Sequence, residues 1–209
     1  MGQAALNLPM TPDEFLVWDE SQTVKHEFVG GEVFAMAGAG KAHVALSLNT
    51  AMALRQHLRG TPCRTTIVDT KLHVAAVGAF FYPDVMVTCS ASDAQDPAVV
   101  REPVLLVEVL SPGTAAFDRG GKFLIYRMLT SLREFVIIDP FNRRCDVFRK
   151  GTDAAGLWVL HPFDQTQDVR LESVDMNLTA EALWDEVPIV EGKPEIEQQR
   201  DLAERRETS

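Results

Sequence analysis

The stretch VLLVEVLS, residues 104–111, decides the fold of this chain. It places six aliphatic side chains around one carboxylate, Glu108. A continuous apolar run of this length is typical of a β-strand that is buried on both faces. Burying an ionised carboxylate costs much free energy unless the charge is paired. We therefore take Glu108 as the first candidate for a functional residue.

Helices and strands alternate on both sides of this strand. Caps and apolar periodicity predict helices that begin at Thr11 and near Lys122, and that cover residues 42–59 and 179–186. In the helix at 42–59, helical spacing marks six apolar positions, which are Val44, Leu48, Ala51, Met52, Leu54 and Leu58. A β-hairpin is expected around Gly30-Gly31. Further strands are expected at 64–76, 81–88, 104–110, 134–139, 145–150, 157–163 and 168–172. The predicted fold class is α/β (α+β), a mixed β-sheet flanked by helices.

The length and composition fit one globular domain, because 46% of the 209 residues are hydrophobic. We expect that domain at residues 10–188, a disordered N-terminal segment at 1–9 and a charged C-terminal tail at 189–209. No apolar run approaches the roughly 18–20 residues of a membrane span, and the N-terminus lacks a signal-peptide pattern. Three widely spaced cysteines without a C-x-x-C pair predict reduced thiols in a cytoplasmic protein.

The net charge of −10 and the pI near 4.9 restrict the partners. They argue against a protein that coats nucleic acid by bulk electrostatics, because phosphate contacts need clustered Lys and Arg. An enzyme with a local basic groove remains compatible with this charge. So does an enzyme whose acidic cleft binds a cation that then meets a phosphate.

A second carboxylate, Asp84, directly precedes the strand expected to end at Thr88. If that strand pairs antiparallel with the VLLVEVLS strand so that Thr88 faces Val104, then Asp84 lies opposite Glu108. Opposed residues share a face, with Cβ atoms about 5 Å apart, so two anions there repel each other. A divalent cation between them relieves this repulsion, and hard oxygen ligands suit Mg²⁺ or Mn²⁺. The register is an assumption, and a protonated carboxyl, an arginine partner or a strand end in water is the alternative.

The segment FDRGGKFLIY, residues 117–126, supplies Asp118 and Lys122 four residues apart, with Tyr126 one turn further on. One interpretation is an ordinary salt bridge on a solvated helix. The other is that Lys122 points at the metal site, where it orients an attacking water or stabilises charge on a pentavalent phosphorus. Because Gly120-Gly121 is a poor helix interior, we expect Asp118 in a loop or cap before the helix.

Two segments carry a family resemblance, YPDVMV at 82–87 and EPVLLVEVLSPGTAAFDRGGKFLIYRMLTSLREFVIIDP at 102–140. Together they resemble the Uma-two family of restriction-type endonucleases, within the PD-(D/E)XK phosphodiesterase superfamily. HEFVGGEVFAMAG at 26–38 resembles the N-terminal part of that family, so the likeness covers most of residues 10–188. The resemblance implies a restriction-endonuclease-like core, Mg²⁺ or Mn²⁺ as cofactor, DNA as the substrate and a homodimer.

The resemblance also implies roles for individual residues. The acids and the lysine that match the family motif, and that would act at the metal and the attacking water, are Asp84, Glu108 and Lys122. The sequence departs from the superfamily's plain pattern at Leu110, where a lysine is usual, and Lys122 on the following helix takes its place. Glu27 corresponds to an early acid of the family and is an additional metal ligand or a support for one. Ser111 hydrogen-bonds near the site or caps a turn, and Asp118 and Tyr126 support Lys122.

From the sequence we expect a metal-dependent endonuclease, and two alternatives stay open. One is a non-catalytic regulatory or binding module with this fold, which the acidic pI favours, and the other is a hydrolase of small phosphodiesters. A phosphate loop at GAGK, residues 38–41, is excluded because Ala35 and Ala42 stand where glycine and Ser or Thr are needed. The scattered histidines do not form a zinc pattern. For His43, near the start of a helix, we favour a structural role.

Overall fold

The structure is a computed structural model of the 209-residue chain, and it describes residues 5–6, 10–36, 38–112, 115, 117–152 and 156–190. The expected N-terminal segment at 1–9 and the expected tail at 189–209 therefore lie almost wholly outside the described residues. Within the described part of the chain, no helix is long and apolar enough to cross a membrane.

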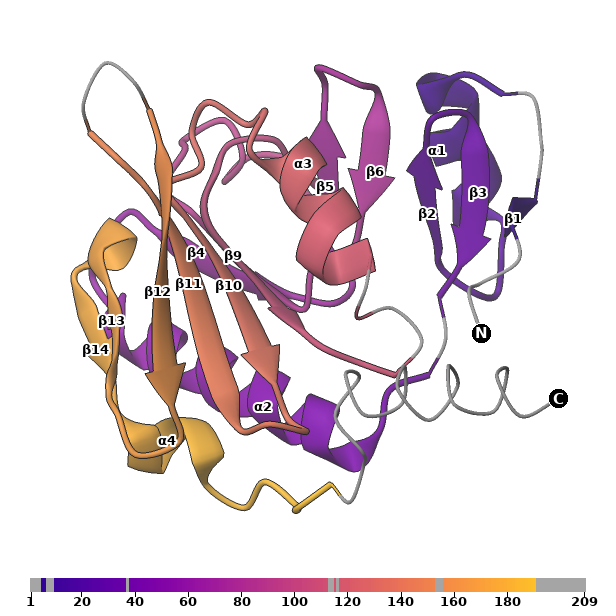
Figure 1. Ribbon diagram of the computed structural model, residues 1–209. Helices are drawn as coiled ribbons and strands as arrows, with labels where there is room; N and C mark the ends of the chain where they lie inside the picture. The colour runs from indigo at the N-terminus through magenta and orange to yellow at the C-terminus, as the bar shows by residue number, and fades with distance from the viewer. Residues whose placement is uncertain are drawn as a thin grey trace, which may run out of the picture.

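A six-stranded mixed sheet carries the VLLVEVLS strand near its centre (Figure 1). Its strands in spatial order are β12 (Trp158–Asp164), β11 (Arg144–Lys150), β10 (Glu134–Asp139), β9 (Pro103–Val109), β7 (Val85–Thr88) and β4 (Arg64–Ile67). All neighbours are antiparallel except β9 and β10, which are parallel. Strand β9 is buried along nearly its whole length, as its continuous apolar sequence predicts.

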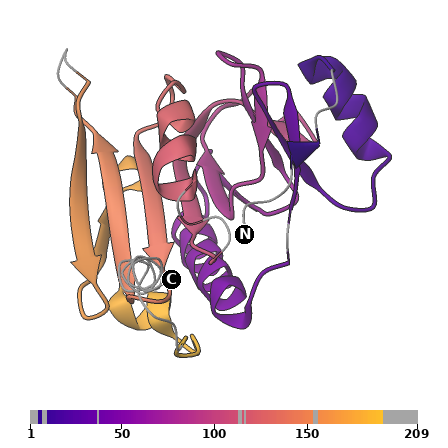
Figure 2. The ribbon, with the colours of Figure 1, turned by 45° about the vertical axis from the view of Figure 1, so that its right-hand side comes forward.

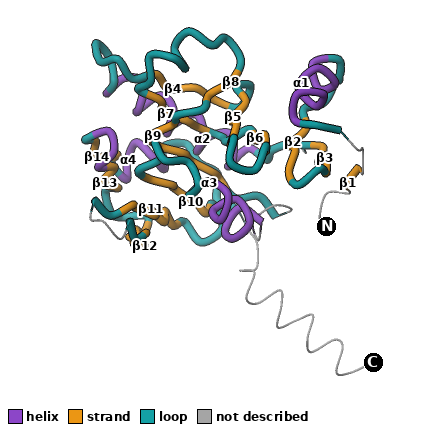
Figure 3. The backbone as a smooth tube through the Cα atoms, turned by 90° about the horizontal axis from the view of Figure 1, so that it is seen from above, coloured by secondary structure: helices purple, strands orange, loops and turns teal. Residues whose placement is uncertain are grey.

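A second six-stranded sheet is built around the predicted hairpin. Its strands in spatial order are β1 (Ala5–Leu6), β3 (Glu32–Ala35), β2 (His26–Val29), β6 (Ala79–Phe81), β5 (Lys71–Val74) and β8 (Val99–Val100). The turn between β2 and β3 has φ of 61° at Gly30 and 86° at Gly31, values that favour glycine. The hairpin prediction is confirmed. Seen from above in Figure 3, β1 to β3 and helix α1 lie at one end of the molecule, away from β12.

The helices pack on these sheets. They are α1 (Pro12–Glu20), α2 (Lys41–His57), α3 (Phe123–Tyr126) and α4 (Ala180–Trp184), with β13 (Val169–Leu171) and β14 (Met176–Leu178) pairing next to α4. A 3-10 turn, Glu172–Val174, connects β13 and β14. Helix α1 begins where the sequence predicts. Thr11 caps it, and the backbone N–H of Thr11 donates a 2.7 Å hydrogen bond to Oε2 of Glu14.

The central sheet separates two apolar cores. Side chains alternate between the faces of a strand, so neighbouring residues of β9 enter different cores. Val107 packs in the core that contains Leu54 of α2, whereas Leu106 packs in the core that contains Tyr126 of α3. Figures 1 and 2 show α2 and α3 on opposite sides of the sheet.

The helical turn ahead of α3 begins earlier than the sequence predicted. A π-helical turn covers Phe117–Lys122, so Asp118 lies inside the helical segment and not in a loop before it. A π-helical turn is a wider turn than the α-helix and is frequently found at functional sites. It accommodates Gly120 and Gly121, which disfavour a regular helix. The α-helix begins next to Lys122, at Phe123, as the sequence predicts, but the expectation of a loop or cap at Asp118 is wrong.

The apolar positions predicted on α2 divide between two faces. The three that meet the sheet are Ala51, Leu54 and Leu58, which are buried. Val44, Leu48 and Met52 are instead 53%, 52% and 61% exposed. Their i, i+4, i+8 spacing is helical, but spacing alone does not reveal which face a helix turns toward the core. Only the structure shows that these three residues face outward.

Cys63 and Cys89 form a disulfide bond, contrary to the expectation of three reduced thiols. The antiparallel pairing of β4 and β7 sets Arg64 opposite Thr88, and the two cysteines adjoin this pair. Since the two cysteines are 26 positions apart in the sequence, only the strand register reveals their proximity. Cys145 is free and buried. The expectation of a cytoplasmic location thereby loses one of its supports.

Candidate active site

The two candidate acids meet where β7 and β9 pair. Val85 pairs with Val107, and this antiparallel register, continued by one residue, puts Asp84 opposite Glu108. The backbone N–H of Val109 donates a 2.7 Å hydrogen bond to Oδ2 of Asp84. Strand β9 therefore holds the Asp84 carboxylate beside the residue that carries the second acid.

The same strand pair departs from the predicted register at its other end. Thr88 lies opposite Pro103 and not opposite Val104, because the register shifts between Val87 and Thr88. A shift of this kind inserts one unpaired residue into one strand. It lies at the far end of the pair from the acids, so it leaves their juxtaposition unchanged.

The ammonium group of Lys122 lies among three carboxyl groups. Its Nζ is 3.0 Å from Oε1 of Glu27, 3.1 Å from Oε1 of Glu108 and 3.2 Å from Oδ1 of Asp118. Tyr126 donates a 2.7 Å hydrogen bond from its hydroxyl to the same oxygen of Glu108. The pair of Asp118 and Lys122 thus exists, but with side-chain exposures of 3% and 7% it is buried and not a pair on a solvated helix.

Glu27 reaches this cluster from the other sheet. It lies on β2, and the backbone N–H of Tyr82, which follows β6, donates to its Oε1 at 3.5 Å. Its ion pair with Lys122 therefore connects the second sheet, which contains the hairpin of β2 and β3, to the π-helical turn ahead of α3.

Burial dominates the electrostatics of the cluster. It raises the pKa of Glu108 well above the usual value; Lys122 opposes the shift and Asp118 reinforces it. Burial also lowers the pKa of Lys122, but the carboxylates of Glu108 and Glu27 outweigh it, and the net shift is well upward. Burial, and next the Glu108 charge, raise the pKa of Tyr126. At neutral pH Lys122 is therefore charged and Tyr126 is neutral.

A cleft of about 620 Å³ opens onto the cluster. The buried charged residues on its floor are Glu27, Asp84, Glu108, Asp118 and Lys122. Ser111, just after β9, also lines the cleft, whereas Tyr126 is fully buried behind Glu108. The structure thus brings together all the residues that the sequence singled out.

His43 belongs to this site, although the sequence favoured a structural role for it. Its Nε2 lies 3.2 Å from Oδ2 of Asp84, and the residue lines the cleft. The only signal in the sequence was its place near the start of the helix that follows the hairpin. That signal does not reveal the contact, because the first turn of α2 meets Asp84 only after the strands have assembled.

A second buried network supports the wall of the cleft. Asp19 accepts a 2.8 Å hydrogen bond from the hydroxyl of Tyr82, and it lies 3.2 Å from both Nζ of Lys71 and Nδ1 of His26. Burial, with the Asp19 hydrogen bond, raises the pKa of Tyr82. These residues come from α1, β2, β5 and the end of β6, so they fix the position of the strand that carries Glu27. No pattern in the sequence predicts this network.

Among the described residues, no group of three or more His, Cys, Asp or Glu side chains is arranged to hold a metal ion. Three carboxyl groups converge on a cation, but this cation is the ammonium of Lys122. The donor set nevertheless has an excess of carboxyl groups, because the cleft holds four buried carboxyl groups and one buried lysine. Carboxylate oxygens are ligands that suit Mg²⁺ and Mn²⁺, so the residues fit a divalent cation.

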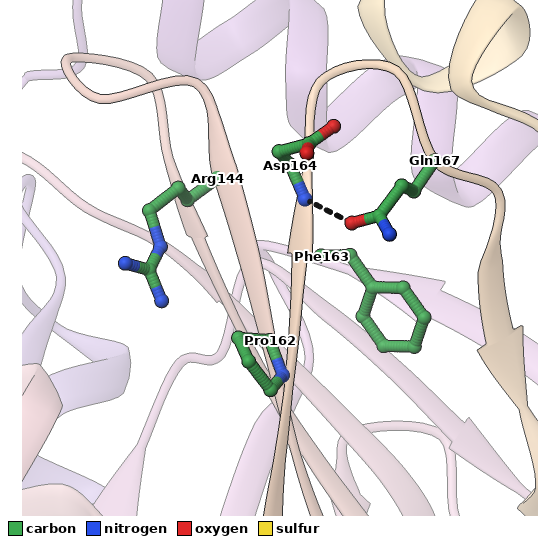
Figure 4. Close-up of a pocket in the computed structure, with 5 residues that line it drawn as sticks. All are labelled: Arg144, Pro162, Phe163, Asp164 and Gln167. Atoms are coloured by element: carbon green, nitrogen blue, oxygen red, sulfur yellow. Dashed lines mark hydrogen bonds between the residues drawn. The ribbon is translucent and has the colours of Figure 1, made fainter.

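A smaller hollow of about 280 Å³ lies at the edge of the central sheet, remote in sequence from these residues. Figure 4 shows the residues that line it, which are Arg144, Pro162, Phe163, Asp164 and Gln167. The backbone N–H of Asp164 donates a 2.9 Å hydrogen bond to Oε1 of Gln167. This smaller hollow has no cluster of buried ionisable groups among its lining residues, so the larger cleft is the candidate active site.

Comparison with known proteins agrees with the geometry. The model of the Uma2 family, described as "Putative restriction endonuclease", matches residues 12–182. The chain belongs to this family. The family resemblance that the sequence suggested is therefore confirmed.

Two curated relatives come from Synechocystis sp. (strain ATCC 27184 / PCC 6803 / Kazusa). "Uncharacterized protein slr1290" is 31% identical over 175 residues, which cover 84% of this chain and 91% of the relative. "Uncharacterized protein sll1609" is 34% identical over 153 residues, which cover 72% of this chain and 85% of the relative.

A solved structure from Anabaena variabilis ATCC 29413, described as a "putative nuclease", has a similar fold. Its TM-score is 0.69 at 17% sequence identity, and the match covers 84% of this chain and 98% of that chain. At this identity the likeness concerns the fold. The predicted fold class, with mixed sheets flanked by helices, is confirmed.

Proposed function

We propose that this Uma2-family chain is an endonuclease that depends on a divalent metal and hydrolyses phosphodiester bonds in DNA. One observation carries the proposal: neighbouring strands place Asp84 and Glu108 side by side on the floor of a cleft that Lys122 also lines. Membership in a family of restriction-type endonucleases supports the same reaction class.

Asp84 and Glu108 would hold Mg²⁺ or Mn²⁺, with Glu27 as a third oxygen donor. When bound, such an ion lowers the pKa of a water molecule and offsets negative charge on phosphate oxygens. The charge balance supports this assignment, because the raised pKa of Glu108 reflects a buried carboxylate that one lysine neutralises only in part. A divalent cation would favour the ionised form of that carboxyl group.

The remaining residues position these groups. Lys122 would donate a hydrogen bond to the attacking water or to the phosphate. Its positive charge would stabilise the negative charge that develops there. Asp118 holds the ammonium at 3.2 Å, and Tyr126 fixes one oxygen of Glu108. Nε2 of His43 lies 3.2 Å from Oδ2 of Asp84 and would help to hold that carboxylate in place. Because all these side chains are buried or half-buried, their geometry is set before a substrate binds.

Cleavage of plasmid and single-stranded DNA with and without Mg²⁺ or Mn²⁺ tests the proposal. We expect Asp84→Asn and Glu108→Gln each to lower the rate at least about 100-fold, the scale of losing one preorganised charge in an active site. Glu181→Gln, at an exposed position on α4, serves as the matched control with wild-type activity. Titration calorimetry with Mn²⁺ should show binding that Glu108→Gln abolishes.

Three outcomes contradict the proposal. Full metal-dependent activity in either site variant removes the assignment of the acids. Absence of Mn²⁺ binding together with absence of cleavage favours the non-catalytic module. Cleavage of dinucleotides but not of polynucleotides favours a hydrolase of small phosphodiesters. The homodimer and the cytoplasmic location stay predictions.

A further inference from the structure

Apolar side chains stand exposed around the mouth of the cleft. Val24, Val44, Leu48 and Ile67 are 48%, 53%, 52% and 49% exposed, and all four line it. We call these four residues the apolar rim. They come from the segment before β2, from α2 and from the end of β4, so they are distant in sequence and gather only in the fold. Exposed apolar side chains that gather around one cleft are typical of a binding site.

The charges in the cleft do not suit the backbone of a DNA duplex. Two of the described lining residues carry an ammonium group, Lys25 and Lys122. Lys25 pairs with Asp69, and Lys122 pairs with the carboxyl groups on the floor. A duplex presents its phosphates outward and keeps its bases stacked inside, so its recognition depends on free Lys and Arg. The rim offers apolar surface instead.

A single strand of nucleic acid exposes the faces of its bases, which the apolar rim can contact. Its bases are unstacked and have apolar faces, and proteins that bind single strands use side chains to contact those faces. The floor of the cleft is also deep, since Glu108 is 4% and Lys122 5% exposed. A flexible strand can bring one phosphate to such a floor while its bases contact the walls.

Cationic side chains that could contact the neighbouring phosphates of such a strand lie along α2. From Val33 to Val68 the chain contains no Asp or Glu, although the protein as a whole has a net charge of −10. Lys41 and Arg55 are exposed, and their spacing puts them on the face of α2 that carries Val44 and Leu48 of the rim. At 1.5 Å per residue they are about 21 Å apart, a length that spans several nucleotides.

We propose that the apolar rim binds unstacked bases, and that the protein binds single-stranded nucleic acid in preference to an intact duplex. The strand follows α2, with phosphates toward Lys41 and Arg55 and bases against Val44 and Leu48. This inference rests on the proposed function for the chemistry at the cleft floor, but the binding preference is measured without cleavage.

Fluorescence anisotropy in EDTA, where no strand is cut, tests the preference. The probes are a labelled single strand of about 20 nucleotides, longer than the exposed face of α2, and the same strand annealed to its complement. We expect the full-length protein to bind the single strand at least about tenfold more tightly. Leu48→Ser and Ile67→Ser, on different elements, should each weaken that binding about three- to tenfold and leave duplex binding unchanged.

Leu160→Ser is the matched control, because Leu160 is 46% exposed on β12, at the edge of the central sheet opposite β4, and does not line the cleft. It should bind both probes as the wild type does. Circular dichroism confirms that each variant is folded, as expected for substitutions at exposed positions.

The results separate this inference from the proposed function. Equal or tighter binding of the duplex overturns the inference, as do rim variants that behave like Leu160→Ser; the rim is then a surface for a protein partner. If metal-dependent cleavage occurs and Glu108→Gln abolishes it, the proposed function stands in either case. If single-strand binding depends on the rim but no polynucleotide is cut, the binding inference stands and the nuclease proposal fails.

Discussion

Replacing Lys122 by methionine tests whether one ammonium group holds the buried cluster together. Its Nζ pairs with three carboxyl oxygens at 3.0 to 3.2 Å. At an effective dielectric constant of about 20, each pair at this distance contributes about 5 kcal/mol. The desolvation of the lysine offsets several kcal/mol of this attraction, and unpairing a buried charge costs about 3–5 kcal/mol in measured cases. We expect Lys122→Met to lower the free energy of unfolding by about 3–5 kcal/mol near pH 8.

The loss should depend on pH through Glu108. Its pKa in the folded state is raised above the ordinary 4.5, so the folded state binds its proton more tightly than the unfolded state. The stabilisation from this proton is fully present below pH 4.5 and is lost as the pH rises through the folded-state pKa. Lys122 is the group that lowers this pKa, and its removal raises the pKa further. The difference between wild type and Lys122→Met should therefore be smaller near pH 5 than near pH 8.

Urea unfolding followed by circular dichroism, in EDTA at both pH values, measures this difference. Lys41→Met is the control: Lys41 is exposed, so its loss should change stability by less than about 0.5 kcal/mol. The reasoning is refuted if Lys122→Met stays within about 1 kcal/mol of wild type near pH 8. It is also refuted if the loss is the same at both pH values.

Two further predictions concern the support of Glu108 and the disulfide. Tyr126→Phe removes the hydroxyl 2.7 Å from Oε1 of Glu108, which should cost about 1–3 kcal/mol in thermal unfolding; an unchanged melting temperature would contradict the role of this bond. Breaking the bond between Cys63 and Cys89, which are 26 residues apart, should cost about 3 kcal/mol in urea unfolding. Alkylation of the unfolded, unreduced protein should modify Cys145 alone by mass spectrometry, and modification of all three thiols would refute the disulfide.

Much of the fold could be predicted because its signals are local. The capping box of Thr11 and the two glycines of the first hairpin act within a few residues of themselves, and both features form as predicted. The neighbouring positions of Asp84 and Glu108 were also predictable, because a two-residue period along paired strands sets which side chains are opposed. The register shift between Val87 and Thr88 could not be predicted, since no turn residue in the sequence marks it.

The rest of the site could not be predicted because it depends on how separate elements pack. The early acid Glu27 was known only by resemblance, and its ion pair with Lys122 needs the hairpin sheet to dock against the π-helical turn. The contact of His43 with Asp84 likewise needs α2 to lie beside the end of β7. Such distances follow from the assembled cores and not from spacing along the chain.

The sequence by itself determined the order of the helices and strands, the buried strand around Glu108 and the family to which the chain belongs. Only the tertiary structure decided that five buried charged side chains share one cleft, that half of the apolar stripe of α2 faces outward, and that Cys63 reaches Cys89. The physical reason is the range of the forces involved. Backbone hydrogen bonds and side-chain periodicity act over a few residues, whereas the packing of one sheet against another joins residues that the sequence keeps far apart.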